Sequence, residues 1–362
     1  MDSVTAIERY ALNRSKRNTI LKRYGIVTLF LLPFLATFIC FFVIPFIYGI
    51  KISLMDFKFS APGKSVYNAE PFLWYRMIFG DLSLKTKSAK VISSISANFW
   101  KSFANSFIFS LIMVPIAVLV PLGLAILVNI KPPGYKVFRA MIYLPSIVPL
   151  TAAGTIFTIL FMDKEAHGLV NEFFNLNIRW MSDIWFKFNI GSYIVEVPYA
   201  WIPIFLMCFW GGWGSNFIIL SAGLQNVPKS LYEAADIDGC SNWKKITNVT
   251  IPGIKGQLVL CLFTTIIGYL GLYGQNYVLS GGGPGVSTLP GSGKTMTIIY
   301  FIQDIVANNS NFRESLYGLG AAASIIYALL VSLISGFQMW CTRERKPGNR
   351  NSEAFAKWHR IR

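Results

Sequence analysis

Six stretches of this 362-residue chain contain no Asp, Glu, Lys, Arg or His: residues 24–50, 102–130, 140–162, 197–224, 256–293 and 315–342. Each meets or exceeds the length of about 20 residues that a helix needs to cross the hydrocarbon core of a bilayer. The fifth stretch should leave the membrane near Ser280, where glycines begin. With 54% hydrophobic and 14% charged residues, the sequence predicts an all-α polytopic membrane protein with six transmembrane helices.

The distribution of Lys and Arg indicates which side the loops occupy. Twenty of the 33 basic residues lie before residue 24, in 131–139, in 229–255 or after residue 341. The other thirteen lie on the opposite side, seven of them in the first outer segment, which weakens the contrast. Because cytoplasmic loops carry the excess of basic residues, both termini are expected in the cytoplasm. Basic tails at 1–23 and 343–362 would then flank a transmembrane domain at 24–342.

Charge and length also bear on partners and processing. The net charge of +16 follows from this topology and from contact with anionic membrane lipid, so it does not indicate nucleic-acid binding. The first apolar stretch is too long for a cleavable signal peptide and should remain as a membrane anchor. His167 and His359 are the only histidines, so the sequence predicts no metal site.

The loop at 225–256 carries clear helix signals. Pro228 suits the start of a short helix, where its missing N–H would be unpaired anyway. Gly239 suits the left-handed residue that ends such a helix, and Ser241 can cap a second one. Pro252 then marks the approach to the next span. The sequence therefore predicts a helix, a turn and a second helix on the cytoplasmic side.

This loop resembles the EAA loop of the permease subunits of ATP-binding-cassette (ABC) importers. That pattern is Glu-Ala-Ala, three residues, Gly, nine residues, Ile, one residue, Leu-Pro, and only Val249 and Ile251 depart from it. Two small alanines would let one helix face enter a groove of another protein, while the glutamate would offer a charge to a basic partner. The resemblance implies that ATPase coupling rests on Glu233, Ala234, Ala235, Asp236, Gly239 and Pro252.

The resemblance extends from about residue 29 to residue 338 and is to carbohydrate permeases of the maltose and glycerol-phosphate type. Its motifs include Leu32-Pro33-Phe34, Gly123-Leu124-Ala125, Phe138-Arg139-Ala140, Tyr143-Leu144-Pro145, Trp180-Met181-Ser182-Asp183 and Leu279 to Pro284. It implies the type I ABC importer permease fold, the bacterial cytoplasmic (inner) membrane, and import of an oligosaccharide, sugar or related polyol.

The same resemblance implies partners. This chain would form half of the translocation pathway beside a second permease subunit, more often a different chain than a second copy. Two ATPase subunits would bind ATP and Mg, and an extracytoplasmic solute-binding protein would deliver the cargo. The chain itself would bind no cofactor and would not be an enzyme.

Two other function classes remain to be weighed. An ATP-independent secondary carrier or channel would usually keep ionisable residues in its spans for relays, and the six stretches contain none. A membrane-embedded enzyme would need a nucleophile, base or metal constellation, and the sequence offers none.

Two residue sets are candidates for the substrate pathway. Aromatic rings stack on the apolar faces of sugars and amides pair with hydroxyls, which suits a cavity that water can enter. In the fifth span, positions i, i+4 and i+7 would share one helix face. The candidates are Tyr269, Tyr273 and Asn276 with Gln275 beside them, and Trp210, Trp213 and Asn216 in the fourth span. Such residues also join membrane helices to one another, which is the alternative role.

Two outer segments, 184–203 and 285–297, are longer than the family pattern. Aromatic residues in the first, Trp185, Phe186, Phe188 and Tyr193, predict a short amphipathic helix in the membrane interface or a docking surface for the solute-binding protein. The second contains Gly291-Ser292-Gly293-Lys294-Thr295, which ends like a phosphate-binding loop. Because no strand precedes it and it lies outside, we expect a flexible loop that binds no ATP.

Overall fold

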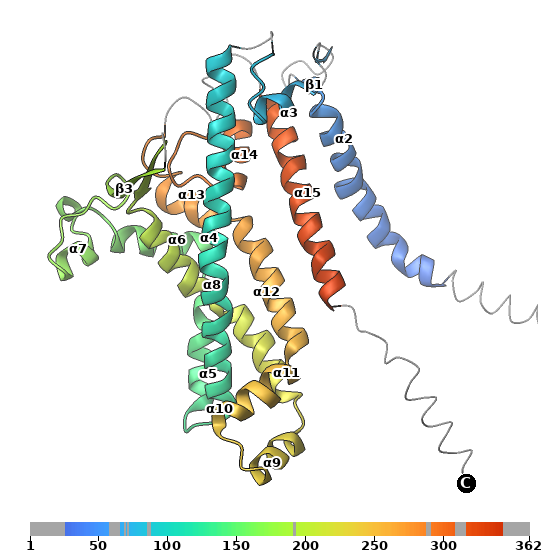
Figure 1. The fold of residues 1–362 in the computed structure, drawn as a ribbon, viewed down its shortest axis with the longest axis vertical. Coiled ribbons are helices and arrows are strands. Elements are labelled where there is room, and N and C mark those ends of the chain that lie inside the picture. The colour runs from blue at the N-terminus through green and yellow to red at the C-terminus, as the bar shows by residue number, and fades with distance from the viewer. Residues whose placement is uncertain are drawn as a thin grey trace, which may run out of the picture.

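The computed structural model describes residues 26–57, 66–68, 70, 72–84, 88–190, 193–286, 291–307 and 316–342. The basic tails predicted at 1–23 and 343–362 lie outside these residues. Within the described residues, four apolar helices are long enough to cross a membrane (Figure 1): Ile26–Ile52, α4 (Ala89–Asn129), α8 (Trp201–Gln225) and α15 (Tyr317–Thr342). Two bent helix pairs bring the total to six when each pair is counted as one span, in agreement with the predicted six.

Helix α4 is longer than its apolar stretch. It begins at Ala89, thirteen residues before the uncharged stretch that starts at residue 102, and contains 41 residues. At 1.5 Å per residue it is about 60 Å long, about twice the thickness of the hydrocarbon core. It is therefore longer than a span needs to be, and its first turns lie beside α3 (Leu73–Ile78) and α14 (Ile298–Ala307), at the end of the molecule that the sequence predicts to be outside (Figure 1).

The third span is the first bent pair. It consists of α5 (Tyr135–Tyr143), the short η3 (Leu144–Ile147) and α6 (Leu150–Leu160), with a change of direction of 92°. The bend occurs at Val148, which is extended at φ −65° and ψ 126°. A residue that precedes a proline avoids the helical region, and Pro149 follows here.

The second bent pair joins the end of the loop at 225–256 to the fifth span. Helix α10 (Asn242–Lys245), the π-helical η5 (Ile246–Thr250) and α11 (Ile251–Gly253) lead into α12 (Lys255–Leu270) through a bend of 73°. Helix α12 ends at Leu270, and the short α13 (Gly274–Ser280) follows after a break. The last of these helices ends at Ser280, where the chain was expected to leave the membrane, but the apolar stretch is not one continuous helix.

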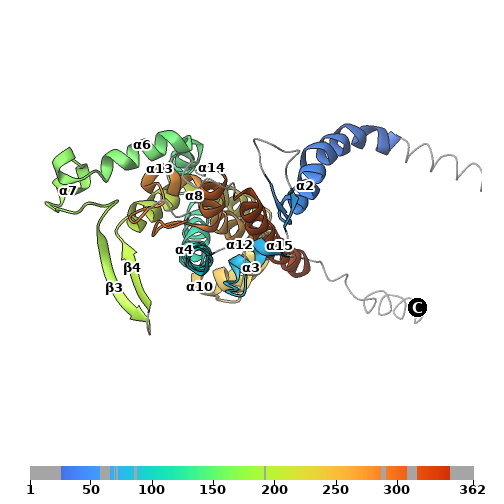
Figure 2. The ribbon, with the colours of Figure 1, turned by 90° about the horizontal axis from the view of Figure 1, so that it is seen from above.

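The first helix stands apart from the bundle. It contains the π-helical turn η1 (Ile39–Val43) and α2 (Ile44–Ile52), and none of the residues Ile26–Ile52 is buried. It contacts α15 near the outer end and diverges from it toward the other end (Figures 1 and 2). The rings of Phe34, Phe38, Phe42 and Phe46 stack along one face at centroid distances of 5.0 to 6.5 Å. This apolar surface must meet lipid or another chain.

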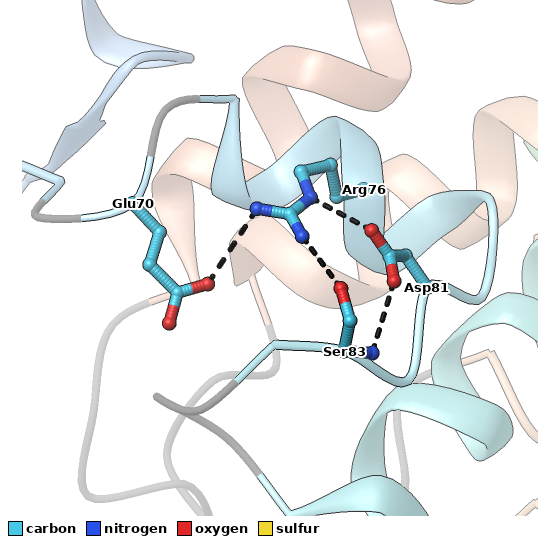
Figure 3. A network of polar contacts seen from close by, with 4 residues as sticks. All are labelled: Glu70, Arg76, Asp81 and Ser83. Carbon is cyan, nitrogen blue, oxygen red and sulfur yellow. Dashed lines mark hydrogen bonds and ion pairs between the residues drawn. The ribbon is translucent and has the colours of Figure 1, made fainter.

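The outer segment after the first helix is ordered around one arginine. Short strands β1 (Met55–Asp56) and β2 (Val66–Tyr67) pair antiparallel ahead of α3. The guanidinium of Arg76 donates to Asp81 and to Ser83, both at 2.8 Å, and lies 3.8 Å from Glu70 (Figure 3). Hydrogen bonds from Ser83 and then from Arg76 lower the pKa of Asp81 to about 2. The carboxylate therefore stays ionised at physiological pH.

The segment predicted as an amphipathic interfacial helix is a β-hairpin, so that prediction is wrong. Strands β3 (Ile184–Ile190) and β4 (Tyr193–Pro198) pair antiparallel, with Lys187 opposite Glu196. Seven consecutive residues from Ile184 are rich in aromatic and branched side chains, which favour a strand over a helix. The hairpin projects from the outer half of the molecule (Figures 1 and 2).

Candidate functional site

The loop between α8 and α12 folds as its sequence predicts. Helix α9 (Lys229–Ile237) begins directly after Pro228, and Gly239 follows it with φ +69°. The side chain of Ser241 caps α10 by accepting a hydrogen bond from the backbone N–H of Lys244 at 3.4 Å. The loop lies at the end of the molecule opposite β1 and α3 (Figure 1).

Two contacts within the chain hold α9 against the second half of the loop. The hydroxyls of Tyr232 and Thr250 lie 3.0 Å apart, and Lys245 forms an ion pair with Asp236 at 2.7 Å. The side chain of Ala235 is 8% exposed. Of the two alanines predicted to enter a partner's groove, Ala235 instead packs inside its own loop, because α9 folds back on η5. That part of the prediction is wrong.

The outward face of the loop is partly apolar. Glu233 and Ala234 are exposed, as expected for residues that meet a partner. Ile237 is 88% exposed and Trp243 is 73% exposed, although both are large and apolar. These two residues were not predicted from the sequence, although large apolar residues in an otherwise polar loop could have indicated an exposed contact surface. Their exposure makes this face a candidate surface for a protein contact.

Pro252 lies where the loop joins the membrane helix. It occupies α11, and Ile254, the residue between α11 and α12, has φ −108° and ψ 17°. The bend of 73° falls at this junction. Only Ile254 separates α11 from α12, so the loop is joined to α12 without a flexible linker.

A cavity of about 500 Å³ lies between α8 and α12. Four of the predicted pathway residues line it: Asn216, Tyr269, Tyr273 and Gln275. A second cavity of about 190 Å³ adjoins it and is lined by Trp210 together with Tyr269 and Gln275. Trp213 and Asn276 line neither of the two.

The prediction that three of these residues share one helix face is wrong. Helix α12 ends at Leu270, and Tyr273 lies in the break with φ −138° and ψ −60°. Tyr269 therefore belongs to α12 and Asn276 to α13. The Tyr269 hydroxyl donates to the Cys208 carbonyl at 3.4 Å, and the absence of a side chain at Gly212 makes room for it.

Asn276 is fully buried and holds the outer loop. Its amide donates to the Thr295 carbonyl at 2.5 Å, and its carbonyl oxygen accepts from the Ser280 hydroxyl at 2.6 Å. Trp213 packs against Phe209, with ring centroids 4.7 Å apart. Asn276 thus has a structural role between α13 and the segment at 291–297, whereas the ring contact of Trp213 lies within α8.

The glycine-rich segment is not the flexible loop that was predicted. In the described part, residues 291–297, its backbone is bound by side chains of α4: Lys101 donates to the Ser292 carbonyl at 2.8 Å, and Asn105 donates to the Lys294 and Met296 carbonyls. Thr295 is buried. Lys294 forms an ion pair with Glu196, so the segment also holds the hairpin.

Two lysines keep the side chain of Glu196 in β4 ionised. The ion pairs with Lys187 and then Lys294 lower the pKa of Glu196 to about 2. Among the residues with described positions, no cluster of His, Cys, Asp or Glu could hold a metal ion.

The family described as the binding-protein-dependent transport system inner membrane component matches residues 89–346. The chain belongs to this family. The match begins at the first residue of α4 and covers all later spans, so the core of this permease is the bundle from α4 to α15.

Curated relatives of this permease cover most of the chain. It is 29% identical to the lactose transport system permease protein LacF of Rhizobium radiobacter, over 90% of this chain and 97% of the relative. It is 28% identical to the arabinooligosaccharides transport system permease protein AraP of Bacillus subtilis, over 85% of each chain.

A solved bacterial ABC transporter that imports the acidic polysaccharide alginate has the same fold. The TM-score is 0.65 at 18% identity, over 91% of this chain and 99% of that one. The predictions of an ABC importer permease, of the type I fold and of an inner-membrane component are thus confirmed.

Proposed function

We propose that this permease forms half of the translocation pathway of an ATP-driven importer of a carbohydrate, either a sugar, an oligosaccharide or a related polyol. The observation that supports this proposal most directly is the cavity between α8 and α12, which is lined by Tyr269, Tyr273 and the amide of Gln275. Tyrosine rings can stack on sugar faces, and the Gln275 amide can pair with hydroxyls. The relatives named for lactose and arabinooligosaccharides support the same cargo class.

Energy would come from two ATPase subunits that bind ATP and Mg. The loop at 225–256 is the proposed contact, through Glu233, Ala234, Ile237 and Trp243 on its outward face. Asp236, Ala235, Gly239 and Pro252 would act from within, because they shape the loop and join it to α12. Closure of the ATPase pair would then move α12 and change which side the cavity opens to.

The remaining partners follow from the surfaces that the chain leaves uncovered. A second permease subunit, proposed to be a different chain, would complete the pathway and could cover the first helix, which no part of the bundle buries. An extracytoplasmic solute-binding protein would dock on the outer side, where the hairpin β3–β4 projects. Both termini are proposed to lie in the cytoplasm, because the basic residues concentrate on that side.

The test is purification of the intact assembly through a tag on this chain, in mild detergent, with identification of its subunits. ATP hydrolysis is then measured with the purified binding protein and a panel of lactose, maltose, arabino-oligosaccharides, glycerol and alginate oligosaccharides. We expect recovery of a second permease and an ATPase, with hydrolysis stimulated by a neutral member of the panel. A chain that purifies alone, with no associated ATPase, would contradict the proposal and favour an ATP-independent secondary carrier or channel.

A further inference from the structure

Helix α4 contains a proline that removes one of its own hydrogen bonds. Pro121 lies inside the helix and is buried. It has no N–H, so the carbonyl four residues earlier, that of Ala117, loses its ordinary helical partner. In a membrane a carbonyl without a partner is costly, because no water is available to replace the lost bond.

An amide from another span supplies the missing donor. Asn216 of α8 donates to the Ala117 carbonyl at 2.8 Å and to the Thr265 hydroxyl of α12 at 2.9 Å. Asn216 is 5% exposed and Ala117 is 3% exposed, so the contact is closed to solvent. Both N–H groups of the amide are therefore engaged, and one side chain joins α4, α8 and α12.

Two of these helices, α8 and α12, line the 500 Å³ cavity, and α4 packs against both. Asn216 and Thr265 both belong to the cavity lining, together with the pathway candidate Tyr269 of α12. The C-terminal end of α8 leads into the loop at 225–256, here called the coupling loop, and α12 begins where that loop ends. The contact thus ties the two helices on either side of the coupling loop to α4.

We propose that Asn216 is a positioning residue for transport: it supplies the hydrogen bond that Pro121 removes from α4 and so fixes α8 and α12, the helices that line the cavity, against α4. It acts through Ala117 and Thr265 and not through the cargo. The transport consequence rests on the proposed function, whereas the contact itself can be tested without any cargo.

The test is a suppressor experiment in the purified assembly. Asn216→Leu keeps the size of the side chain and removes both donors, which leaves the Ala117 carbonyl unpaired. Pro121→Ala returns an N–H at the position that can pair with this carbonyl within α4. The matched control is Pro115→Ala in the same helix, since the carbonyl four residues before Pro115 belongs to Leu111, which is 65% exposed.

We expect Asn216→Leu to lower the yield and melting temperature of the assembly, and Asn216→Leu/Pro121→Ala to restore both. Asn216→Leu/Pro115→Ala should remain as impaired as the single variant. In vesicles with the cargo found above, Asn216→Leu should lower the maximum uptake rate about tenfold, because an unpaired buried carbonyl shifts the equilibrium between transporter conformations by about tenfold. The half-saturating concentration should stay within about twofold, because Asn216 does not contact the cargo.

Three results would overturn the inference. A double variant with Pro121→Ala that is no more stable than Asn216→Leu would show that the Ala117 carbonyl is not the group that needs the amide. An increase in half-saturating concentration that Pro121→Ala leaves unrepaired would make Asn216 a cargo contact. Loss of yield in every variant, including the suppressed one, would also count against it. Absence of any transported sugar would instead challenge the proposed function, with the stability pattern intact.

Discussion

Ile237 offers a sharp test of the coupling loop, because its side chain does nothing visible for the fold. It is 88% exposed, so replacing it with serine removes almost no contact within the chain. If an ATPase subunit covers it fully, the lost burial is worth about 2 kcal/mol, which corresponds to about a 30-fold weaker association. Ile237→Ser should therefore leave the melting temperature of the isolated permease unchanged and weaken ATPase binding.

The assay titrates the purified ATPase onto permease in lipid nanodiscs and measures both binding and ATP hydrolysis. Leu82→Ser is the matched control, since Leu82 is 61% exposed and lies in the outer segment beside Asp81. It should bind the ATPase as the unmodified protein does. Equal affinity of Ile237→Ser and the control, with both near the unmodified value, would refute the assignment of this face as the docking surface.

Three further predictions concern single residues. Gly239→Val should reduce assembly yield and uptake, because a β-branched residue at φ +69° is strained. Gly239→Asn should have a milder effect, since asparagine tolerates this region of backbone conformation. Equal yields of the two variants would contradict this prediction. Glu233→Lys should uncouple ATP hydrolysis from uptake by reversing an exposed contact charge, and Glu233→Gln serves as the control; a normal uptake rate in Glu233→Lys would mean that the acid is only solvated. For Glu196 the pKa is lowered to about 2, so its ion pairs with Lys187 and Lys294 are present above about pH 4.5 and are lost as the pH falls toward 2. Protease cleavage of the hairpin should therefore rise over that acidic range, and Glu196→Gln should show raised cleavage at neutral pH with no such dependence.

The local structure of the coupling loop was predictable from its residues. Pro228, Gly239 and Ser241 act through backbone geometry and capping within a few positions, and the structure places each as its sequence indicates. The number of spans was predictable for a similar reason, since crossing a membrane requires an uninterrupted length of apolar residues. The hairpin at 184–198 was not recognised, because its aromatic residues were interpreted as membrane-interface anchors although aromatic and branched residues favour a strand.

The candidate cavity was only partly predictable. Gln275 and Tyr269 line it, as predicted. The prediction that Asn276 shares a helix face with Tyr269 assumed one continuous helix, but α12 ends at Leu270. Nothing in helical periodicity reveals such a break, because the buried outer segment supports it: the Thr297 hydroxyl donates to the Leu272 carbonyl at 2.5 Å. That contact joins residues 25 positions apart.

The sequence by itself determined the membrane class, the number of spans and the form of the coupling loop, because these follow from apolar length, charge asymmetry and nearest-neighbour backbone preferences. Only the tertiary structure decided which polar side chains face the cavity and which hold helices together. An asparagine has the same chemistry in either role, and its partner depends on what packing brings beside it. For Asn216 that partner is a carbonyl 99 positions away, left without a helical donor by Pro121.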